Sequence, residues 1–203
     1  MVKLWNKTME LENPYYNTSP RDTYYDKERR LYRSYLYGAY GSNLNIEQMM
    51  YRCPHAEAVG SMVLQNHALV FRAVADIEYC KGSTVEIGLW KITRGCEDRL
   101  DIYEGFPSFY KKKLESDPTL ADYDAKAVML YFMGDRKWVS PPSDGYLQSV
   151  AQGYRDFNLD DACLIDALKR SYLDETPVPK RKIKLETRSE KIKRLQKQFK
   201  LDY

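Results

Sequence analysis

Residues 35–44 read YLYGAYGSNL, and this stretch decides the fold. Its first half alternates apolar side chains in the manner of a β-strand, and the alternation stops at Gly41. Asn43 or Asn45 can then cap a helix, because a short side-chain oxygen accepts a hydrogen bond from a free N–H of the first helical turn. The stretch therefore predicts a strand, a tight turn and a helix start.

The turn at residues 40–44 is the first of two motifs that can carry chemistry. Backbone N–H groups converge at such a turn, and with the positive end of a helix they form a binding site for a carboxylate or a polarised carbonyl. Gly41 lets the backbone approach a ligand closely, and Ser42 and Asn43 add short hydrogen-bonding side chains. A plain strand-to-helix turn with an asparagine cap explains the same residues, so this motif alone does not decide the function.

The second motif is LDIYEGFP at residues 100–107. It closes a short predicted helix, residues 96–104, whose last turn contains Glu104. The helix dipole disfavours a carboxylate there, and Asp101 places the same charge one turn earlier. Both effects predict a raised pKa for Glu104, which suits proton transfer near neutral pH. The alternative is a solvent-exposed glutamate before a C-cap glycine.

Further periodic stretches extend the fold prediction in both directions. Strand-like stretches occur at residues 61–77, 84–92 and 125–133, and helical patterns occur at residues 145–157 and 160–173. Strands dominate the middle of the chain and helices its ends. This distribution predicts an α+β fold with a curled, mainly antiparallel sheet.

Composition divides the chain into three segments. Residues 1–34 are a polar, tyrosine-rich N-terminal extension without a sustained apolar period, residues 35–173 form the predicted domain, and residues 174–203 are a basic C-terminal tail. The tail also has apolar residues at the spacing of a narrow amphipathic helix, namely Ile192, Leu195 and Phe199.

Composition also excludes several classes of protein. Of the 203 residues, 43% are hydrophobic, which excludes a wholly disordered chain. No run approaches the roughly 20 apolar residues that a transmembrane helix needs, and no secretion signal is evident, so we expect a cytoplasmic protein without a membrane partner. The two histidines and the dispersed cysteines indicate neither a metal site nor a disulfide framework; the cysteines are Cys53, Cys80, Cys96 and Cys163.

The formal net charge of +3 hides a strongly basic segment. Residues 180–200 contain ten lysines and arginines against two glutamates. Such a segment can attract nucleic acid or an acidic protein partner. Charge runs are more often solvated surface, so neither partner is favoured.

The order of these motifs along residues 35–172 resembles the γ-glutamylcyclotransferase-like family; the motifs are YGSNL at 40–44, RCP at 52–54, YEGFP at 103–107, PPS at 141–143 and GYR at 153–155. The resemblance implies a small mixed β-barrel with peripheral helices. It also implies an enzyme that cyclises a small γ-glutamyl amino acid or γ-glutamyl amine and releases 5-oxoproline and a free amine. Such enzymes use no metal or organic cofactor, and their partner is the small-molecule γ-glutamyl substrate.

The resemblance assigns roles to particular residues. Glu104 corresponds to the general acid/base, and Tyr110 to a tyrosine that lines the substrate cavity. Arg52 is a further candidate, for which the adjoining Cys53-Pro54 favours a structural role. The substrate loop corresponds to Tyr40, Gly41, Ser42, Asn43 and Leu44. A second reading is a non-catalytic ligand-binding or regulatory module on the same fold, with the basic tail docking a partner.

Overall fold

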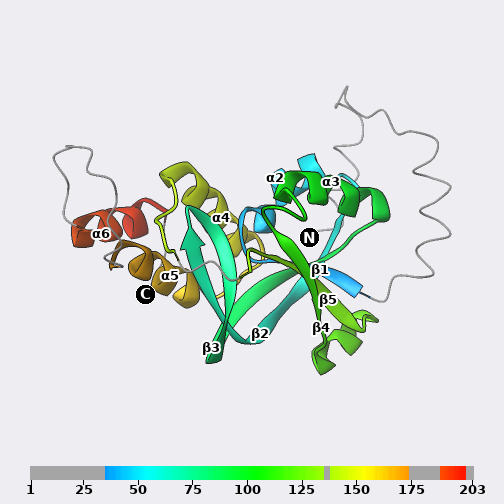
Figure 1. Cartoon of the computed structure of the whole chain (residues 1–203). Helices are drawn as coiled ribbons and strands as arrows, with labels where there is room; N and C mark the ends of the chain where they lie inside the picture. Colours follow the sequence, from blue (N-terminus) through cyan, green and yellow to red (C-terminus); the bar gives the residue numbers. More distant parts are fainter. Residues whose placement is uncertain (1–34, 135–137, 174–187, 200–203) are drawn as a thin grey trace. The chain divides into compact units, whose positions relative to one another are not determined.

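The structure is a computed structural model that describes residues 35–134, 138–173 and 188–199 (Figure 1). The predicted N-terminal extension and much of the basic tail therefore lie outside the described residues. In chain order, with η for a 3-10 helix, the elements are β1 (Tyr35–Ala39), η3 (Ser42–Leu44), α2 (Ile46–Arg52), β2 (Glu57–Arg72), β3 (Val74–Lys91), α3 (Arg94–Glu104), β4 (Lys111–Glu115), η4 (Pro118–Tyr123), β5 (Ala127–Phe132), α4 (Asp144–Asp156), α5 (Ala162–Leu173) and α6 (Arg188–Phe199).

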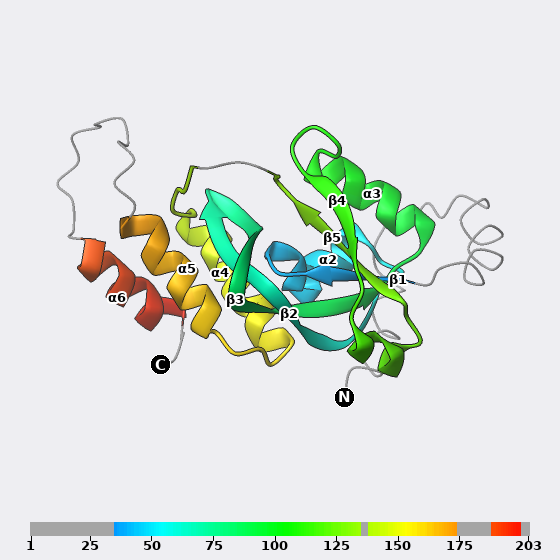
Figure 2. The same cartoon turned by 60° about the horizontal axis from the view of Figure 1, so that its bottom comes forward.

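The five strands form one mixed sheet in the order β2-β3-β1-β5-β4. β1 pairs with β5 in parallel, and the other neighbouring strands pair antiparallel. The predicted α+β class with a mainly antiparallel sheet is confirmed. Across the described residues the edge strands β2 and β4 are not paired with each other, so the sheet is open where the resemblance implied a barrel (Figure 2).

The long β2–β3 hairpin corrects one sequence prediction. Residues 61–77 are not one strand, because the chain reverses at Ala73, where φ is 65°, and Arg72 pairs with Val74. No glycine, proline or asparagine marks this turn in the sequence. The prediction also missed the edge strand β4, because its three lysines interrupt the apolar alternation that indicates a strand. Charged side chains at a sheet edge commonly protect against pairing with another chain.

α4, α5 and α6 lie beside one another, and α2 and α3 lie beside each other (Figure 1). α2 contacts α3, whereas α4 and α5 contact α6 and the strands and turns nearby. α6 packs through Ile192 and Leu195, which are 8% and 1% exposed. Among the described residues, no helix is long and apolar enough to cross a bilayer.

α4 packs directly against the turn that follows β1. At Gly153, an added Cβ would lie 2.6 Å from the backbone nitrogen of Asn45 and would also meet Leu44. Near the end of α4, Asp156 accepts a hydrogen bond of 2.9 Å from the backbone N–H of Ile46, the first residue of α2. The missing side chain of Gly153 therefore lets a helix from late in the chain hold the early turn in place.

We expect Gly153→Ala to destabilise the domain by about 1–3 kcal/mol, because an overpacked contact forces the backbone apart. Gly145→Ala is the matched control in the same helix, since no atom lies within 4 Å of its added Cβ. Alanine favours a helix over glycine, so the control should keep its stability or gain up to about 1 kcal/mol. Urea unfolding measures both changes. Equal stability of the two variants would contradict the packing described above.

Candidate active site

The turn after β1 separates the roles of its two asparagines. Asn45 caps α2, because its Oδ1 accepts a hydrogen bond of 2.9 Å from the backbone N–H of Gln48. Asn43 lies within η3, and its side chain caps no helix. The sequence left both residues as capping candidates, and the structure assigns the cap to Asn45. The side chain of Asn43 is thereby free to point toward α3.

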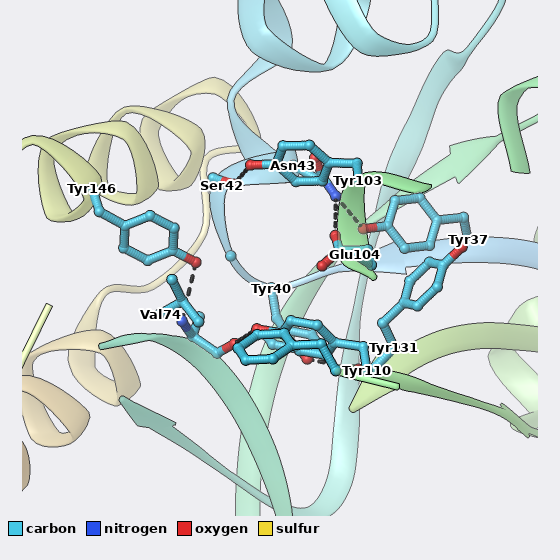
Figure 3. Close-up of a pocket in the computed structure, with 13 residues that line it drawn as sticks. Tyr37, Tyr40, Ser42, Asn43, Val74, Tyr103, Glu104, Tyr110, Tyr131 and Tyr146 are labelled. Carbon is cyan, nitrogen blue, oxygen red and sulfur yellow. Dashed lines mark hydrogen bonds between the residues drawn. The ribbon is translucent and has the colours of Figure 1, made fainter. Parts of the chain in front are cut away.

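Asn43 is buried and is the centre of a hydrogen-bond network (Figure 3). Its Nδ2 donates to the hydroxyl of Tyr37 at 2.7 Å and to Oε1 of Glu104 at 2.8 Å. Its Oδ1 accepts from Nη1 of Arg52 at 2.6 Å. The network therefore joins β1, α2 and the end of α3 through one side-chain amide.

Glu104 is the last residue of α3, and Gly105 follows in the left-handed conformation with φ of 63°. Burial raises the pKa of Glu104 to about 7, although the Arg52 charge and the hydrogen bond from Asn43 act in the opposite direction. Within the described residues, Oε1 accepts the bond from Asn43 and Oε2 has no donor. One carboxylate oxygen thus remains available to a ligand.

The raised pKa of Glu104 agrees with the direction predicted from the sequence, but its main cause is burial and not the charge of Asp101. Asp101 lies 2.8 Å from Nζ of Lys112 and accepts a hydrogen bond of 2.6 Å from the hydroxyl of Tyr131. Lys112, which also pairs with Glu97 at 2.7 Å, offsets part of the charge of Asp101, and Tyr131 donates to one of its oxygens. The sequence could not show this, because Lys112 belongs to the unpredicted strand β4.

Glu104 lies in the wall of a cavity of about 240 Å³. No lysine, arginine or histidine lines this cavity among the described residues. Six tyrosines do, namely Tyr37, Tyr40, Tyr103, Tyr110, Tyr131 and Tyr146. The cavity is therefore aromatic and polar, with one carboxylate.

Most of the predicted site residues meet in this cavity; they are Tyr40, Gly41, Ser42, Asn43, Glu104 and Tyr110. Leu44 does not line it. Its side chain is fully buried in the hydrophobic core, where it lies near Gly88 and Gly153. Leu44 thus attaches the loop to the hydrophobic core, and we assign it no contact with a ligand.

Three of the cavity tyrosines donate their hydroxyl protons to the protein itself. Tyr40 donates to the backbone carbonyl of Tyr131 at 2.6 Å, and Tyr110 donates to that of Ala75 at 2.6 Å. The hydroxyl of Tyr131 donates to Asp101. These hydroxyls fix the cavity wall and have no proton left for a ligand.

Two other hydroxyls act only as acceptors within the described structure. The hydroxyl of Tyr37 accepts from Asn43. The hydroxyl of Tyr146 accepts from the backbone N–H of Ala75 at 3.0 Å and has no acceptor of its own within the described residues. Its proton is therefore the group that it can offer to a ligand. Tyr37 and Tyr146 therefore present two O–H donors to the cavity.

The loop backbone supplies further donors. The N–H groups of Gly41 and Asn43 have no acceptor within the described residues. A Cβ at Gly41 would lie 2.9 Å from the hydroxyl of Tyr146 and 3.1 Å from Cβ of Ala75. Glycine at this position therefore allows the loop and Tyr146 to approach each other closely, with their donors at one cavity.

Comparison with known proteins gives no match to a protein-family model and no curated protein with significant sequence similarity. Solved structures do match. A structure of gamma-glutamyl cyclotransferase is 22% identical, with a TM-score of 0.54, and the match covers 79% of this chain and 98% of that one. An uncharacterized protein from Homo sapiens is 24% identical, with a TM-score of 0.53, and the match covers 78% of this chain and 97% of that one.

The chain has the γ-glutamylcyclotransferase-like fold. YkqA from Bacillus subtilis is a third match, with 16% identity and a TM-score of 0.57; the match covers 74% of this chain and 58% of YkqA. The predicted resemblance is confirmed at the level of the fold. Among the described residues, no cluster of histidine, cysteine, aspartate and glutamate side chains could hold a metal ion.

The cavity of this γ-glutamylcyclotransferase-like fold also contains residues that sequence reasoning missed. Tyr103 adjoins Glu104 and Tyr37 precedes the YGSNL loop, so their places next to the two motifs were available signals. Phe109 adjoins the predicted Tyr110, which was a signal of the same kind, whereas Tyr146 had no such signal. Tyr146 lies in the first turn of α4, far along the chain from both motifs, and only the packing of α4 brings it to the loop.

The burial of Glu104 predicts a pH-dependent stability. Its pKa rises from the usual 4.5 to about 7 in the folded protein. Stability from this group is therefore fully present below pH 4.5 and is lost as the pH rises through 7. Glu104→Gln keeps the shape of the side chain without its charge. At pH 8 its free energy of unfolding should therefore exceed that of wild type by up to about 3 kcal/mol. The difference should vanish at pH 4.5.

Urea unfolding at the two pH values measures this effect. Glu57→Gln, at an exposed position at the start of β2, is the matched control and should show little difference from wild type at either pH. A Glu104→Gln protein no more stable than wild type at pH 8 would show that the carboxylate is solvated.

Proposed function

We propose that the protein is a γ-glutamylcyclotransferase-type enzyme. It cyclises the γ-glutamyl group of a small γ-glutamyl amino acid or γ-glutamyl amine and releases 5-oxoproline and a free amine. The observation that carries this proposal is the position of Glu104, a half-buried carboxylate with a pKa of about 7, beside the donor-rich loop at residues 41–43. The fold shared with gamma-glutamyl cyclotransferase supports it.

Substrate binding uses the donors that the protein leaves without acceptors. A γ-glutamyl group presents an α-carboxylate and a γ-carbonyl oxygen, and both accept hydrogen bonds. The N–H groups of Gly41 and Asn43 and the hydroxyls of Tyr37 and Tyr146 supply four donors for these oxygens. Donors that are fixed before the reaction stabilise developing negative charge without reorganisation.

Glu104 performs the proton transfers. Its free oxygen takes a proton from the α-ammonium group of the substrate, and the amine nitrogen then attacks the γ-carbonyl carbon of the same molecule. A new C–N bond closes the five-membered ring, and the carbonyl oxygen becomes an oxyanion that the donors stabilise. Glu104 returns the proton to the departing nitrogen as the original C–N bond breaks. Glu104 then takes the second proton from the ring nitrogen and passes it to the released amine, which leaves as an ammonium ion. The products are 5-oxoproline and the protonated amine, and Glu104 is again ionised.

This reaction needs no serine or cysteine nucleophile, because the substrate supplies its own. Ring closure is intramolecular, so the enzyme has to hold the glutamyl chain folded with its amine next to its γ-carbonyl. The tyrosine walls of a cavity of about 240 Å³ suit this task, since they confine a small flexible chain.

Mass spectrometry tests the reaction directly. The purified protein is incubated with γ-glutamyl amino acids, γ-glutamyl amines and glutathione, and 5-oxoproline is measured. We expect release by wild type and a loss of about 10²–10⁴-fold in Glu104→Gln, since it removes the general base. Asp98→Asn is the matched control on the same helix; Asp98 is 56% exposed and pairs with Arg94 on the surface. It should retain full activity.

Two results would contradict the proposed reaction. Retained turnover in a folded Glu104→Gln protein would exclude Glu104 as the base. Silence of folded wild type across the whole panel, together with measurable binding of a γ-glutamyl compound, would favour the ligand-binding module over the enzyme.

The pKa of Glu104 also predicts the pH dependence of turnover. A base must be ionised, so activity should increase with pH up to about 7 and fall about tenfold per unit below it. The profile of kcat/KM measures this limb for the free enzyme. An acid limb near pH 4.5 would indicate a solvated carboxylate and would contradict the buried base.

Partners of the basic segment and a cytoplasmic location stay predictions. Within the described part of that segment, two cations contact the domain itself: Lys191 lies 5.2 Å from the ring of Tyr172, and Arg194 lies 3.7 Å from Asp144. Some of the charge that suggested an external partner is therefore directed to the protein's own surface.

A further inference from the structure

Arg52 occupies an unusual position behind the active-site network. It is the last residue of α2, and its Nη1 donates to Asn43 while its Nη2 donates to Oε1 of Gln48 at 2.9 Å. Its guanidinium carbon lies 3.9 Å from the ring centroid of Tyr103. Within the described residues it forms no salt bridge with a carboxylate. Its shortest polar contact is therefore the hydrogen bond of 2.6 Å to the side-chain amide of Asn43.

The chemistry of the asparagine amide makes this contact decisive. An amide has an acceptor oxygen on one side and a donor nitrogen on the other, so its direction depends on its neighbours. The hydroxyl of Tyr37 can donate or accept and does not select a direction. Arg52 can only donate, so the amide oxygen of Asn43 must face it. The amide nitrogen must then face Tyr37 and the carboxylate.

The reversed amide would place two donors against each other at Arg52 and two acceptors against each other at Glu104. An ionised carboxylate accepts only, so both contacts would be repulsive. Arg52 therefore selects the one orientation of Asn43 that supports the ionised form of Glu104.

We propose that Arg52 is a positioning residue that fixes the side-chain amide of Asn43, so that this amide holds Oε1 of Glu104 and leaves Oε2 facing the substrate. The same orientation makes Tyr37 an acceptor and directs its proton to the cavity. This role rests on the proposed function, but the effect of Arg52 on Glu104 does not require a bound substrate.

The charges around Glu104 make Arg52 the group to test. Burial raises the pKa of Glu104, and the Arg52 charge followed by the Asn43 hydrogen bond lowers it. Asp101, one turn earlier on α3, pairs with Lys112, which also pairs with Glu97. The other titratable groups of the cavity are tyrosine hydroxyls. One of them belongs to Tyr103, and burial raises the pKa of the other five, namely Tyr37, Tyr40, Tyr110, Tyr131 and Tyr146.

The test compares Arg52→Met with Arg52→Lys and with Arg94→Met. Arg94 pairs with Asp98 on the exposed side of α3 and serves as a control for lost charge. The pKa of Glu104 is measured by carbon NMR of labelled glutamate, with the resonance assigned by its absence in Glu104→Gln.

We expect Arg52→Met to raise this pKa by about 1 unit, because an opposite charge is lost. Turnover should fall about 10–100-fold. The acid limb of the pH profile should move upward by the same one unit as the pKa. Arg52→Lys should keep the pKa near wild type through its charge but still lose turnover, because an ammonium lacks the planar fork that reaches both Asn43 and Gln48. Arg94→Met should match wild type.

A double-mutant cycle shows whether Arg52 acts through Asn43. In an Asn43→Ala background, Arg52→Met should cost much less turnover than it does in wild type. Equal cost in both backgrounds would overturn the positioning role. A folded Arg52→Met protein with the wild-type pKa and pH profile would also overturn it, and would leave Arg52 as a structural residue.

Failure of this proposal is distinguishable from failure of the proposed function. The NMR titration needs no substrate, so it tests the action of Arg52 on Glu104 even if wild type releases no 5-oxoproline. If Arg52→Met does not fold, the same double-mutant cycle with Arg52→Lys decides the question: an equal cost of Arg52→Lys in the wild-type and Asn43→Ala backgrounds would overturn the positioning role.

Discussion

The side-chain amide of Asn43 is the contact on which the site depends. It lies between a hydroxyl on β1, a guanidinium at the end of α2 and a carboxylate at the end of α3. Each of these elements alone would place its polar group at a helix end or a strand face, with water as its partner. Joined by one amide, the groups hold each other in fixed orientations inside the protein, where a missing partner is costly.

The fold provides this arrangement through close packing late in the chain. Gly153 brings α4 against the turn at Asn45, and Gly41 lets Tyr146 of the same helix approach the loop. The result is a small aromatic cavity in which burial raises the pKa of Glu104 to about 7. An ionised carboxylate in such a place weakens the folded state. That cost is the expected counterpart of a base that works near neutral pH, since activity and stability compete at such sites.

The sequence predicted the parts of the structure that depend on local patterns. The strand, turn and helix start around the YGSNL loop, the short helix ending at Glu104 and the two later helices are all present. It missed contacts between distant segments. No local signal shows that the chain reverses at Ala73, that Lys112 pairs with Asp101, or that Tyr146 reaches the loop. The raised pKa of Glu104 was therefore predicted in direction but assigned to the wrong main cause, because burial is a property of the packed fold.

The most direct test of the central claim is a crystal structure of the Glu104→Gln protein with a γ-glutamyl compound bound. We expect the glutamyl group in the tyrosine-lined cavity, its carboxylate or γ-carbonyl oxygen on the N–H groups of Gly41 and Asn43, and its α-amino nitrogen within hydrogen-bond distance of the substituted side chain. A ligand bound outside this cavity, or one whose amino group points away from position 104, would contradict Glu104 as the base that starts the ring closure.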